Sequence, residues 1–469
     1  MKQGLLPYGV EVVEEAGAVT ARGGLGLVVE AMRALGVSQA IKSHVRIRQR
    51  ARGNDEVAMI EAVVMLLAAG GECIDDMAVL RTDAGLCRLV DRELPSPDAV
   101  RRFLYSFHDP ELIECARRER APGHVAYIPG ENAALRGLAH VNVELLNRVA
   151  AQGKSTQATL DHDATIQESH KQESLAHYKG GRGYQPSVIY WAEQDLVVAD
   201  EYRDGNVPAG MANLRLIQRG FTSLPTTVTE YGFRSDSACY EEQVLQWLAN
   251  PQREDGPRGK IRFTISADMS TELRAVCERV RQPRWLLVEE RAEESVHWAD
   301  VEFTPGDWPK DAQPLRYVAV RIRKQQGYLF AAGYDTKYLA VVSNRWELSG
   351  EKLLRWHWAK AGTIEHVHDV TKNELGAAVP PCGRFGANAA WYRLSLLAYN
   401  ILSAMKSLVL PAPLSAARPK RLRFALFTIA GRLISHAGKL VLQISQAAER
   451  LAGLLEARRR LAVLAAASP

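Results

Sequence analysis

Two aspartates spaced two residues apart are the first feature of this sequence that could do chemistry. Asp161 and Asp163 lie in an alternating segment, and because a strand repeats every two residues, both carboxylates face the same side. Glycines between residues 180 and 183 interrupt the chain, and strand-like runs follow at Tyr184–Trp191 and Leu196–Tyr202. Such carboxylates can bind a divalent metal ion. They can equally form an ordinary exposed face, so this segment alone leaves both interpretations open.

Two more aspartates directly follow predicted strands. Asp236 comes after the β-branched strand Thr226–Arg234 and precedes a helix at Glu241–Leu248. Asp268 follows the strand Lys260–Ser266 in the same way. An acid at the carboxyl end of a strand, just before a helix, is a common position for a catalytic or metal-binding carboxylate in an α/β core. Both residues are therefore candidates for a second acid.

Composition and charge describe a soluble globular protein that could hold a polyanion. The chain has 469 residues, 47% apolar and 24% charged, which suits about two to four domains. Its formal net charge of +5 permits nucleic-acid binding without proving it. Ten Lys or Arg follow Pro411 against two acids, and a second basic cluster near the start contains no acid. That second cluster consists of Arg46, Arg48, Arg50 and Arg52. Basic clusters at both ends suit DNA held across several domains.

Cysteine usage and hydropathy predict a cytoplasmic protein that does not enter a membrane. The six cysteines include no CxxC pair, which is typical of reduced thiols. The start of the chain lacks the apolar core of a signal peptide. The most apolar run, Val57–Gly70, is too short to span a bilayer and carries Glu61.

Helical periodicity dominates the first part of the chain and predicts a helical domain at residues 1–152, which its basic cluster makes a candidate DNA-binding domain. Ser96 and Pro97 favour a helix start as N-cap and first-turn residue. The segment Arg46–Arg52 between two helices could be a DNA-contacting arm, or equally a solvated loop. The predicted helices are Gly24–Leu35, Glu56–Ala69, Ala99–Phe107 and Glu131–Ala151.

A β-rich segment is predicted at residues 281–347. Six of the nine tryptophans fall between Trp285 and Trp358, in or beside it. A single tryptophan usually belongs to a core, but this concentration suggests that some stack on DNA bases. The candidates for that role are Trp298, Trp346 and Trp358.

The remainder is predicted to be helical again. One helix runs from Ser349 to about Asn373, and Glu365 and Lys372 share one face of it because they are seven residues apart. The apolar helix Ala387–Leu408 follows. Residues 411–469 are predicted as a basic helical region with helices at Leu422–His436 and Leu440–Leu464.

Taken together, these segments resemble the DDE-type transposases of bacterial insertion sequences, in particular the cut-and-paste family. The fold that this resemblance implies is mixed α+β and α/β. An RNase H-like core at residues 153–280 and 348–410 is interrupted by a β-rich insertion domain at 281–347. The resemblance covers roughly residues 20–440 and rests on eight motifs in the family's order. These are LDHDAT, KQE…YKGGRGYQP, EYRDGN, FRSDSACY, IRFTISADM, VVSNRWE, GTIEHVHDVTK and RFGANAAWYRLSLLAYNI.

By the same resemblance, Asp163, Asp236 and Glu365 are the three catalytic acids. They would bind two Mg²⁺ ions, for which Mn²⁺ could substitute. The family signature Y-x2-R-x3-E-x6-K is matched here by Glu365 and Lys372, whereas Trp358 and Ala361 replace its tyrosine and arginine. Lys372 would hold a backbone phosphate, and Lys360 lies next to the missing arginine as a further DNA-binding candidate. Asp161 remains a rival first acid, and Asp268 a rival second acid.

The implied function is an endonuclease and strand-transfer enzyme acting as a homodimer on double-stranded DNA. It would bind the terminal inverted repeats of its element and then target DNA, in the cytoplasm of a bacterium and at the nucleoid when bound. Two alternatives stay open. The chain could be an RNase H-fold nuclease without strand transfer, or a DNA-binding protein that has lost catalysis.

Overall fold

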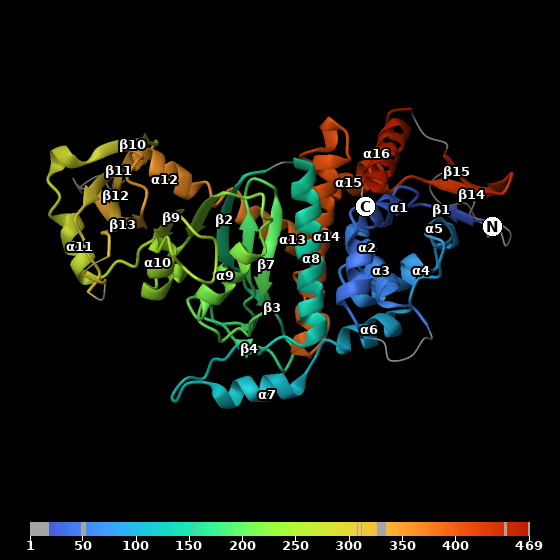
Figure 1. Cartoon of the computed structure of the whole chain (residues 1–469), viewed down its shortest axis with the longest axis horizontal. Helices are drawn as coiled ribbons and strands as arrows, with labels where there is room; N and C mark the ends of the chain where they lie inside the picture. Colours follow the sequence, from blue (N-terminus) through green and yellow to red (C-terminus); the bar gives the residue numbers. More distant parts are fainter. Residues whose placement is uncertain are drawn as a thin grey trace, which may run out of the picture.

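The molecule is elongated, with helices at one end, a large sheet in the middle and a group of long strands at the other end (Figure 1). The structure is a computed structural model. It describes residues 18–47, 53–153, 155–306, 308–310, 312–325, 334–444 and 448–467.

Eight helices precede the large sheet within the described residues. Ser96 caps α6 by accepting a hydrogen bond from the Ala99 amide, with Pro97 in the first turn, so this predicted helix start is confirmed. The helix α3 is buried along almost its whole length, and its Glu61 accepts a hydrogen bond from the Ser38 hydroxyl. The helices are α1 (Gly26–Ala34), α2 (Val37–His44), α3 (Glu56–Ala69), α4 (Met77–Arg81), α5 (Ala84–Leu89), α6 (Pro97–Tyr105), α7 (Pro110–Glu119) and α8 (Ala133–Gly153).

The central element is a nine-stranded mixed sheet with the order β10-β11-β12-β13-β9-β8-β2-β6-β7. The antiparallel strands β2, β6 and β7 form one side, and β8 and β9 run parallel to β2. The strands are β2 (Gln157–Ala164), β6 (Ser187–Trp191), β7 (Leu196–Glu201), β8 (Glu230–Ser235), β9 (Ile261–Ser266), β10 (Leu286–Glu290), β11 (Glu294–Val301), β12 (Arg316–Gln325) and β13 (Tyr334–Ser343). Strands are thus present in every segment where the sequence predicted them.

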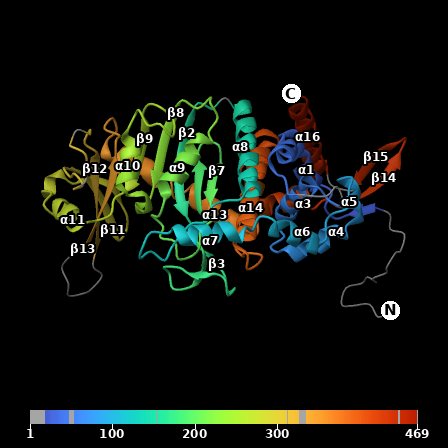
Figure 2. The same cartoon turned by 60° about the horizontal axis from the view of Figure 1, so that its bottom comes forward.

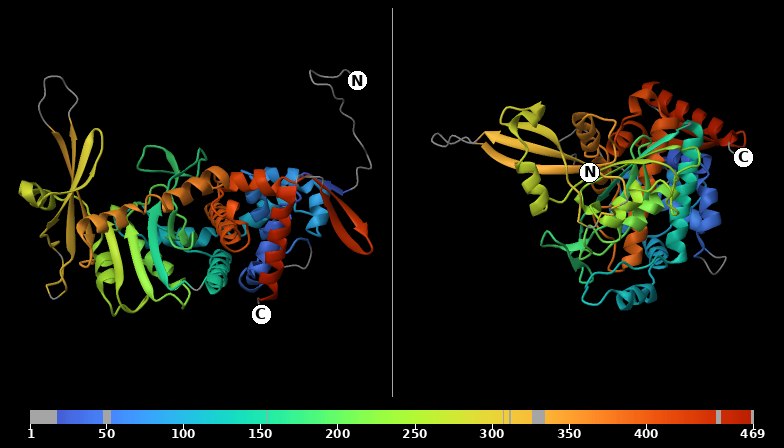
Figure 3. Two further views of the ribbon diagram at one scale, coloured as in Figure 1. Left: turned by 90° about the horizontal axis from the view of Figure 1, so that it is seen from above. Right: turned by 60° about the vertical axis from the view of Figure 1, so that its left-hand side comes forward.

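The predicted β-rich segment does not form a separate sheet but extends the central one. Three residues of β13 pair with β9, from Val341 opposite Ser266 to Ser343 opposite Thr264. The strands β11, β12 and β13 continue well beyond this junction as an antiparallel arm. Figure 3 shows the arm projecting from the end of the molecule.

Helices cover both faces of the central sheet. The helices α9 (Asn213–Thr222) and α10 (Glu242–Ala249) pack on one face, and α11 (Thr271–Glu278) follows β9. On the other face, α14 (Phe385–Leu408) lies between β7 and the N-terminal helices α3, α6 and α8. Twenty residues of α14 are buried within the one chain, so this helix is a core element that joins the sheet to the N-terminal helices.

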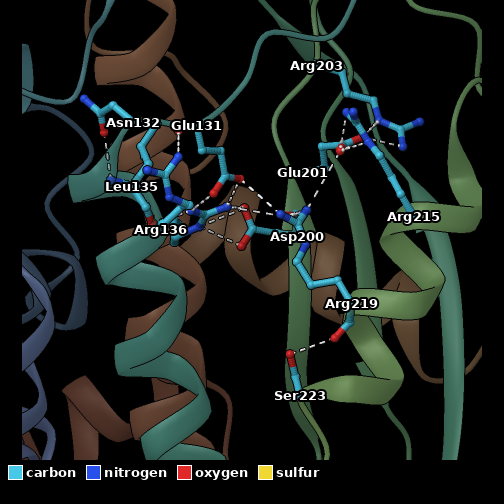
Figure 4. Close-up of polar contacts among 11 residues, drawn as sticks. Glu131, Asn132, Leu135, Arg136, Asp200, Glu201, Arg203, Arg215, Arg219 and Ser223 are labelled. Atoms are coloured by element: carbon cyan, nitrogen blue, oxygen red, sulfur yellow. Dashed lines mark hydrogen bonds and ion pairs between the residues drawn. The ribbon is translucent and has the colours of Figure 1, made fainter. Parts of the chain in front are cut away.

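A network of ion pairs fastens this junction (Figure 4). The buried Arg393 of α14 donates hydrogen bonds to Asp200 of β7 and to Glu131, just before α8. On the other side of β7, Glu201 accepts hydrogen bonds from Arg203 and Arg215. The sequence analysis did not identify these residues, because the partners lie up to 262 positions apart.

The predicted single helix from Ser349 to Asn373 is wrong. The chain forms α12 (Gly350–Trp358) and α13 (Ile364–Glu374), separated by a short connection at residues 359–363. Gly362 favours a break because glycine is a poor helix former. The hydroxyl of Thr363 also donates a hydrogen bond to Asp161 of β2, which fixes the connection against the sheet. This tertiary contact could not be read from helical periodicity.

The prediction of two basic helices at the carboxyl end is also partly wrong. Only the short α15 (Pro419–Leu422) and the π-turn Arg423–Phe427 precede a hairpin of β14 (Gly431–His436) and β15 (Lys439–Ile444). Ala437 and Gly438 both have positive φ, 50° and 74°, which suits the two-residue turn of a hairpin. The helix α16 (Ala448–Ala466) follows.

The two ends of the described chain lie together. The strand β1 (Ala18–Thr20) pairs with β14, and α16 packs against α1 (Figure 2). Periodicity within residues 422–464 could not indicate the β14–β15 hairpin, because the third strand of its sheet, β1, comes from the other end of the sequence.

A small third sheet with the order β3-β5-β4 lies beside the central one. Its strands are β3 (Gln167–Glu168), β4 (Leu175–Ala176) and β5 (Arg182–Tyr184). Within the described residues no single helix meets the length and hydropathy needed to cross a membrane, and only the bent pair Glu56–Ala69 with Ile74–Arg81 does so jointly.

Candidate active site

Asp163 and Asp236 lie at the ends of two neighbouring parallel strands. Asp163 is the penultimate residue of β2, and Asp236 follows β8 directly and caps a short 3-10 turn, η2 (Ser237–Cys239). The register places Asp161 opposite Arg234, so both strands end at the same edge of the sheet. The side chain of Asp163 is only 18% exposed, whereas Asp236 is exposed.

The surroundings disfavour the charged form of both carboxylates. Burial raises the pKa of Asp163, and the nearby charge of Asp161 raises it further. Burial likewise raises the pKa of Asp236, and the charge of Asp163 adds to this effect. Two neighbouring acids whose pKa values are raised and whose charges repel each other are a favourable site for a cation.

Lys360 is the nearest positive charge to both acids. It lies in the connection between α12 and α13, and its Nζ is 3.6 Å from Oδ1 of Asp163. Its charge lowers the pKa of Asp163 and of Asp236, against the effect of burial. Lys360 was predicted as a DNA-binding residue, and the structure shows where its ammonium lies: beside the acids.

Asp161 has a different environment from Asp163 although both point to the same face of β2. It is fully buried, and its two oxygens accept hydrogen bonds from Nε and Nη2 of Arg234 at 2.7 and 2.8 Å. The Thr363 hydroxyl donates to it as well. Arg234 in turn donates to the carbonyl of Trp356 in α12, so Asp161 anchors the α12–α13 segment to the sheet.

Glu365 lies in the first turn of α13, with an exposed side chain. Together with Asp236, Lys360 and Trp358 it lines a cavity of about 450 Å³. The opposite wall of this cavity comes from the β11–β13 arm, through apolar residues such as Val320. In the part of the chain that the structure describes, no three His, Cys, Asp or Glu side chains lie close enough together to hold a metal ion. Asp268 is exposed just beyond β9 and does not line this cavity.

His368 is a neighbour of Asp163 that the sequence analysis did not identify as part of the site. Its Nε2 is 3.7 Å from Oδ2 of Asp163, and neither ring nitrogen has a hydrogen-bond partner among the described residues. Burial lowers the pKa of His368 to about 3, so the ring is neutral near pH 7 and the contact is not an ion pair. An unpartnered nitrogen beside a carboxylate fits a site in which a further ligand is still to be bound.

Lys372 contacts the chain just beyond Asp163. Its Nζ donates a hydrogen bond to the carbonyl of Ile166, in the segment that follows β2. Burial lowers the pKa of Lys372, and the charge of Lys179 lowers it further. Both lysines of the α12–α13 segment thus act on Asp163 through their charge.

The remaining predicted DNA-binding residues lie in different places. Trp358 is 37% exposed and lines the cavity of Asp236 and Glu365. Trp346 is 60% exposed and lines a separate cavity. Trp298 packs on the start of α12, where a Cβ at Gly350 would lie only 2.1 Å from its ring. Arg46 is exposed just after α2, and the other predicted arginines of that arm, Arg48, Arg50 and Arg52, lie outside the described residues.

Comparison with known proteins identifies the family. The family model described as transposase DDE domain group 1 matches residues 7–466. The chain therefore belongs to the DDE transposases, a family whose members act in DNA transposition and generally use divalent metal ions.

Two further comparisons add little. No curated protein matches this chain. A cryo-EM structure of the piggyBac transposase synaptic complex with hairpin DNA aligns with a TM-score of 0.47 and 10% identity, covering 86% of this chain and 78% of that chain. That similarity is too weak to support an argument, so the family assignment rests on the sequence match.

Proposed function

We propose that this chain is an active transposase that cuts DNA at the ends of its element and joins those ends to target DNA. Asp163, Asp236 and Glu365 are its catalytic acids. The observation that carries the proposal is the pair Asp163 and Asp236, two mutually repelling carboxylates with raised pKa values at the adjoining ends of parallel strands. Glu365 reaches the same cavity as Asp236 from the first turn of α13.

The order of five strands supports an RNase H-like core. In β7-β6-β2-β8-β9, three antiparallel strands are followed by two that run parallel to the first of them in the chain. In this proposal the first acid lies on the central strand β2, the second directly follows the parallel neighbour β8, and the third lies on α13. The β10–β13 strands, inserted between β9 and α12, take the place of the β-rich insertion domain.

The donor set around the two aspartates fits a hard divalent cation. Carboxylate oxygens are the ligands that Mg²⁺ prefers, and the raised pKa values of both aspartates mean that a bound cation would be stabilised there. We assign Asp163, Asp236 and Glu365 as the residues that would hold Mg²⁺, for which Mn²⁺ could substitute. When bound, Mg²⁺ would supply Lewis-acid activation of the attacking oxygen and charge stabilisation at the phosphate.

The other residues of the site position the acids and the DNA. Arg234 and Thr363 hold Asp161, and through it they keep the α12–α13 segment, which carries Glu365, against the sheet. Lys360, whose ammonium lies beside Asp163, and Lys372, whose ammonium lies at Ile166 beyond β2, would bind backbone phosphates of the DNA strand. Trp358 is the tryptophan best placed to contact an unstacked base, because it lines the cavity of the acids.

The assembly that we propose is a homodimer on two element ends. Residues 1–152 would bind the terminal inverted repeats, with Arg46, Arg48, Arg50 and Arg52 as contacts to the backbone. The basic carboxyl-terminal region at 411–469 adds positive charge at the same end of the molecule. We propose a cytoplasmic location, where this DNA is found.

A cleavage assay tests the proposal. Purified protein is incubated with Mg²⁺ and a duplex that carries the inverted repeat flanking its coding sequence. We expect cutting at the repeat boundary by the wild type. We expect binding without cutting by Asp163→Ala, Asp236→Ala and Glu365→Ala. Asp268→Ala is the matched control and should cut normally. Cutting that survives Asp163→Ala, or a wild type that binds but never cuts, contradicts the proposed function.

A further inference from the structure

A glycine-rich hairpin beside the acids has no role in the chemistry described so far. It comprises residues 175–184, from β4 through a tight tip to β5, and includes the whole sequence YKGGRGY. Leu175 pairs with Gly183 and Ala176 with Arg182. The projecting hairpin lies on the same side of the molecule as the β11–β13 arm (Figure 3, left).

The base of the hairpin is firmly braced. Arg182 donates a hydrogen bond to the carbonyl of Gln172 at 2.7 Å. Gly183 packs so closely that a Cβ there would lie 2.2 Å from the Gln167 carbonyl oxygen, which excludes any other residue without rearrangement. His177 is buried, and its Nδ1 accepts a hydrogen bond from the Lys179 amide. The tip is therefore held on a defined support.

The tip presents an aromatic ring and a cation to solvent. Tyr178 is 72% exposed, among the largest values for a large hydrophobic side chain in the described residues. The Nζ of Lys179 lies 5.8 Å from the centre of the Tyr178 ring. A solvent-exposed aromatic ring beside an ammonium is the combination with which proteins hold single-stranded nucleic acid, through base stacking and phosphate contact.

The base of the hairpin lies close to Lys372 and to the end of β2. The Nζ of Lys372 donates a hydrogen bond to the carbonyl of Ile166, three residues beyond Asp163. The next residue, Gln167, pairs with Tyr184 at the base of the hairpin.

The charges around Lys372 agree with this arrangement. Burial lowers the pKa of Lys372 and the charge of Lys179 lowers it further, whereas the charges of Glu168 and Asp163 raise it. In the described part of the chain, no carboxylate lies within ion-pair distance of either ammonium. Two neighbouring ammonium groups that form no ion pair there are suited to one bridging phosphate.

We propose that the tip of this hairpin grips one DNA strand next to the phosphate that is cut. Tyr178 stacks on a base of that strand, and Lys179 and Lys372 share a backbone phosphate. Tyr178 and Lys179 are positioning residues in this scheme, not catalytic ones. The inference rests on the proposed function, since it takes the acids as the place where the strand is cut.

The first test is crosslinking of the full-length protein. p-Benzoylphenylalanine replaces Tyr178, and the complex with the inverted-repeat duplex is irradiated in Ca²⁺, which supports binding without cutting. We expect crosslinks within one or two nucleotides of the cleavage position. The same photoreactive residue at Val79, which is 55% exposed on α4 among the N-terminal helices, is the control and should not crosslink near the cleavage position. Crosslinks from position 178 only to distant nucleotides, or none, overturn the inference.

The second test separates stacking from charge. Tyr178→Ala is expected to weaken binding of the pre-cut element end roughly tenfold, whereas Tyr178→Phe and Tyr178→Trp retain binding. Lys179→Ala should reduce the slope of log affinity against log salt by about one, whereas Lys310→Ala, at an exposed lysine outside the regions assigned to DNA binding, leaves it unchanged. Wild-type binding by Tyr178→Ala, or a defect of Tyr178→Phe equal to that of Tyr178→Ala, contradicts the stacking role.

The outcomes also distinguish this inference from the proposed function. A wild type that cuts at the repeat, together with a Tyr178→Ala variant that binds and cuts equally well, refutes only the hairpin grip. A wild type that neither binds nor cuts the repeat refutes both. Because Tyr178 is exposed, its substitution should leave the melting temperature unchanged, and a lowered melting temperature would show a structural role instead.

Discussion

The ammonium of Lys360 lies 3.6 Å from the carboxylate of Asp163, at the point where α12 gives way to α13. This contact makes a lysine the nearest cation to the acid pair when no metal ion is bound. A metal ion between Asp163 and Asp236 would take over that compensation and leave the ammonium free for a DNA phosphate. The break between α12 and α13 therefore has a role, because Lys360 lies in this connection and its ammonium is close to Asp163.

Neutralising Asp163 and Asp161 should have opposite effects on stability. Asp163→Asn removes one of two desolvated carboxylates that repel each other, so we expect the melting temperature at pH 7 to rise by a few degrees. Asp161→Asn leaves the buried Arg234 without its counter-ion, and we expect a loss of about 3–5 kcal/mol. Thermal unfolding of both variants beside the wild type checks this. A stabilised Asp161→Asn variant would contradict our assignment of roles on β2.

The stabilisation by Asp163→Asn should depend on pH. Because the pKa of Asp163 is raised in the folded protein, folding takes up protons at this residue, and stability falls as pH rises from the ordinary aspartate range through the raised pKa. The advantage of Asp163→Asn is therefore complete above the raised pKa and disappears toward the ordinary one. Urea unfolding at several pH values measures the difference in free energy of unfolding. If the difference in free energy of unfolding between wild type and Asp163→Asn did not change with pH, the pKa of Asp163 would not be raised in the folded protein.

Divalent metal ions should stabilise the wild type through the acids. Mg²⁺, Mn²⁺ or Ca²⁺ at a hundred times its dissociation constant is expected to add about 2.7 kcal/mol to the free energy of unfolding. We expect Asp163→Asn and Asp236→Asn to lose this response, and the exposed Asp268→Asn to keep it. Calorimetric scans with metal ions and with a chelator provide the measurement. If metal ions still stabilise both Asp163→Asn and Asp236→Asn, the ions bind at another site.

Arg393 should be essential to the junction between the sheet and the N-terminal helices. Arg393→Ala leaves Asp200 and Glu131 without their shared partner, and we expect a loss of about 3–5 kcal/mol. Arg136→Ala, an exposed neighbour that contacts only a backbone carbonyl, serves as the control. Equal stability of the two variants would show that the network contributes nothing.

The same network predicts acid sensitivity. Although burial opposes it, the charges of Arg393 and Arg219 lower the pKa of Glu131 to about 2. A depressed pKa stabilises the fold above the ordinary glutamate value, and this stability is lost as pH falls toward 2. The wild type should therefore lose its advantage over Arg393→Ala between about pH 4.5 and 2. Urea unfolding of both proteins across this range checks the expectation.

Much of the strand pattern was predictable from sequence, because the signals are local. Alternation identified β2, and a β-branched run followed by Ser235, Asp236 and Ser237 placed an acid at a strand end. The break at residues 359–363 was not predictable, since it depends on the hydrogen bond from Thr363 to Asp161, 202 residues away. The β14–β15 hairpin was missed for the same reason, because its third strand is β1.

In the candidate site, too, local sequence signals predicted some features, whereas others depend on tertiary contacts. The spacing of Glu365 and Lys372 correctly placed them on one helix, but the position of Lys360 depended on where that helix begins. His368 follows Glu365 by three residues, as the last histidine of the EHVH run, and this spacing could have suggested a place near the acids. Its contact with Asp163 depends on how α13 packs against β2, which the sequence alone does not specify.

The central claim is that Asp163 holds a divalent metal ion, and a change of metal specificity tests it most directly. Asp163→Cys replaces a hard oxygen ligand by sulfur, which binds Mn²⁺ better than Mg²⁺. We predict that this variant binds the inverted repeat and fails to cut it in Mg²⁺. In Mn²⁺ we predict that cutting recovers at the same position, whereas Asp163→Ala stays inactive in both ions. Recovery by Asp161→Cys instead of Asp163→Cys, or cutting by Asp163→Ala in Mg²⁺, would contradict the account.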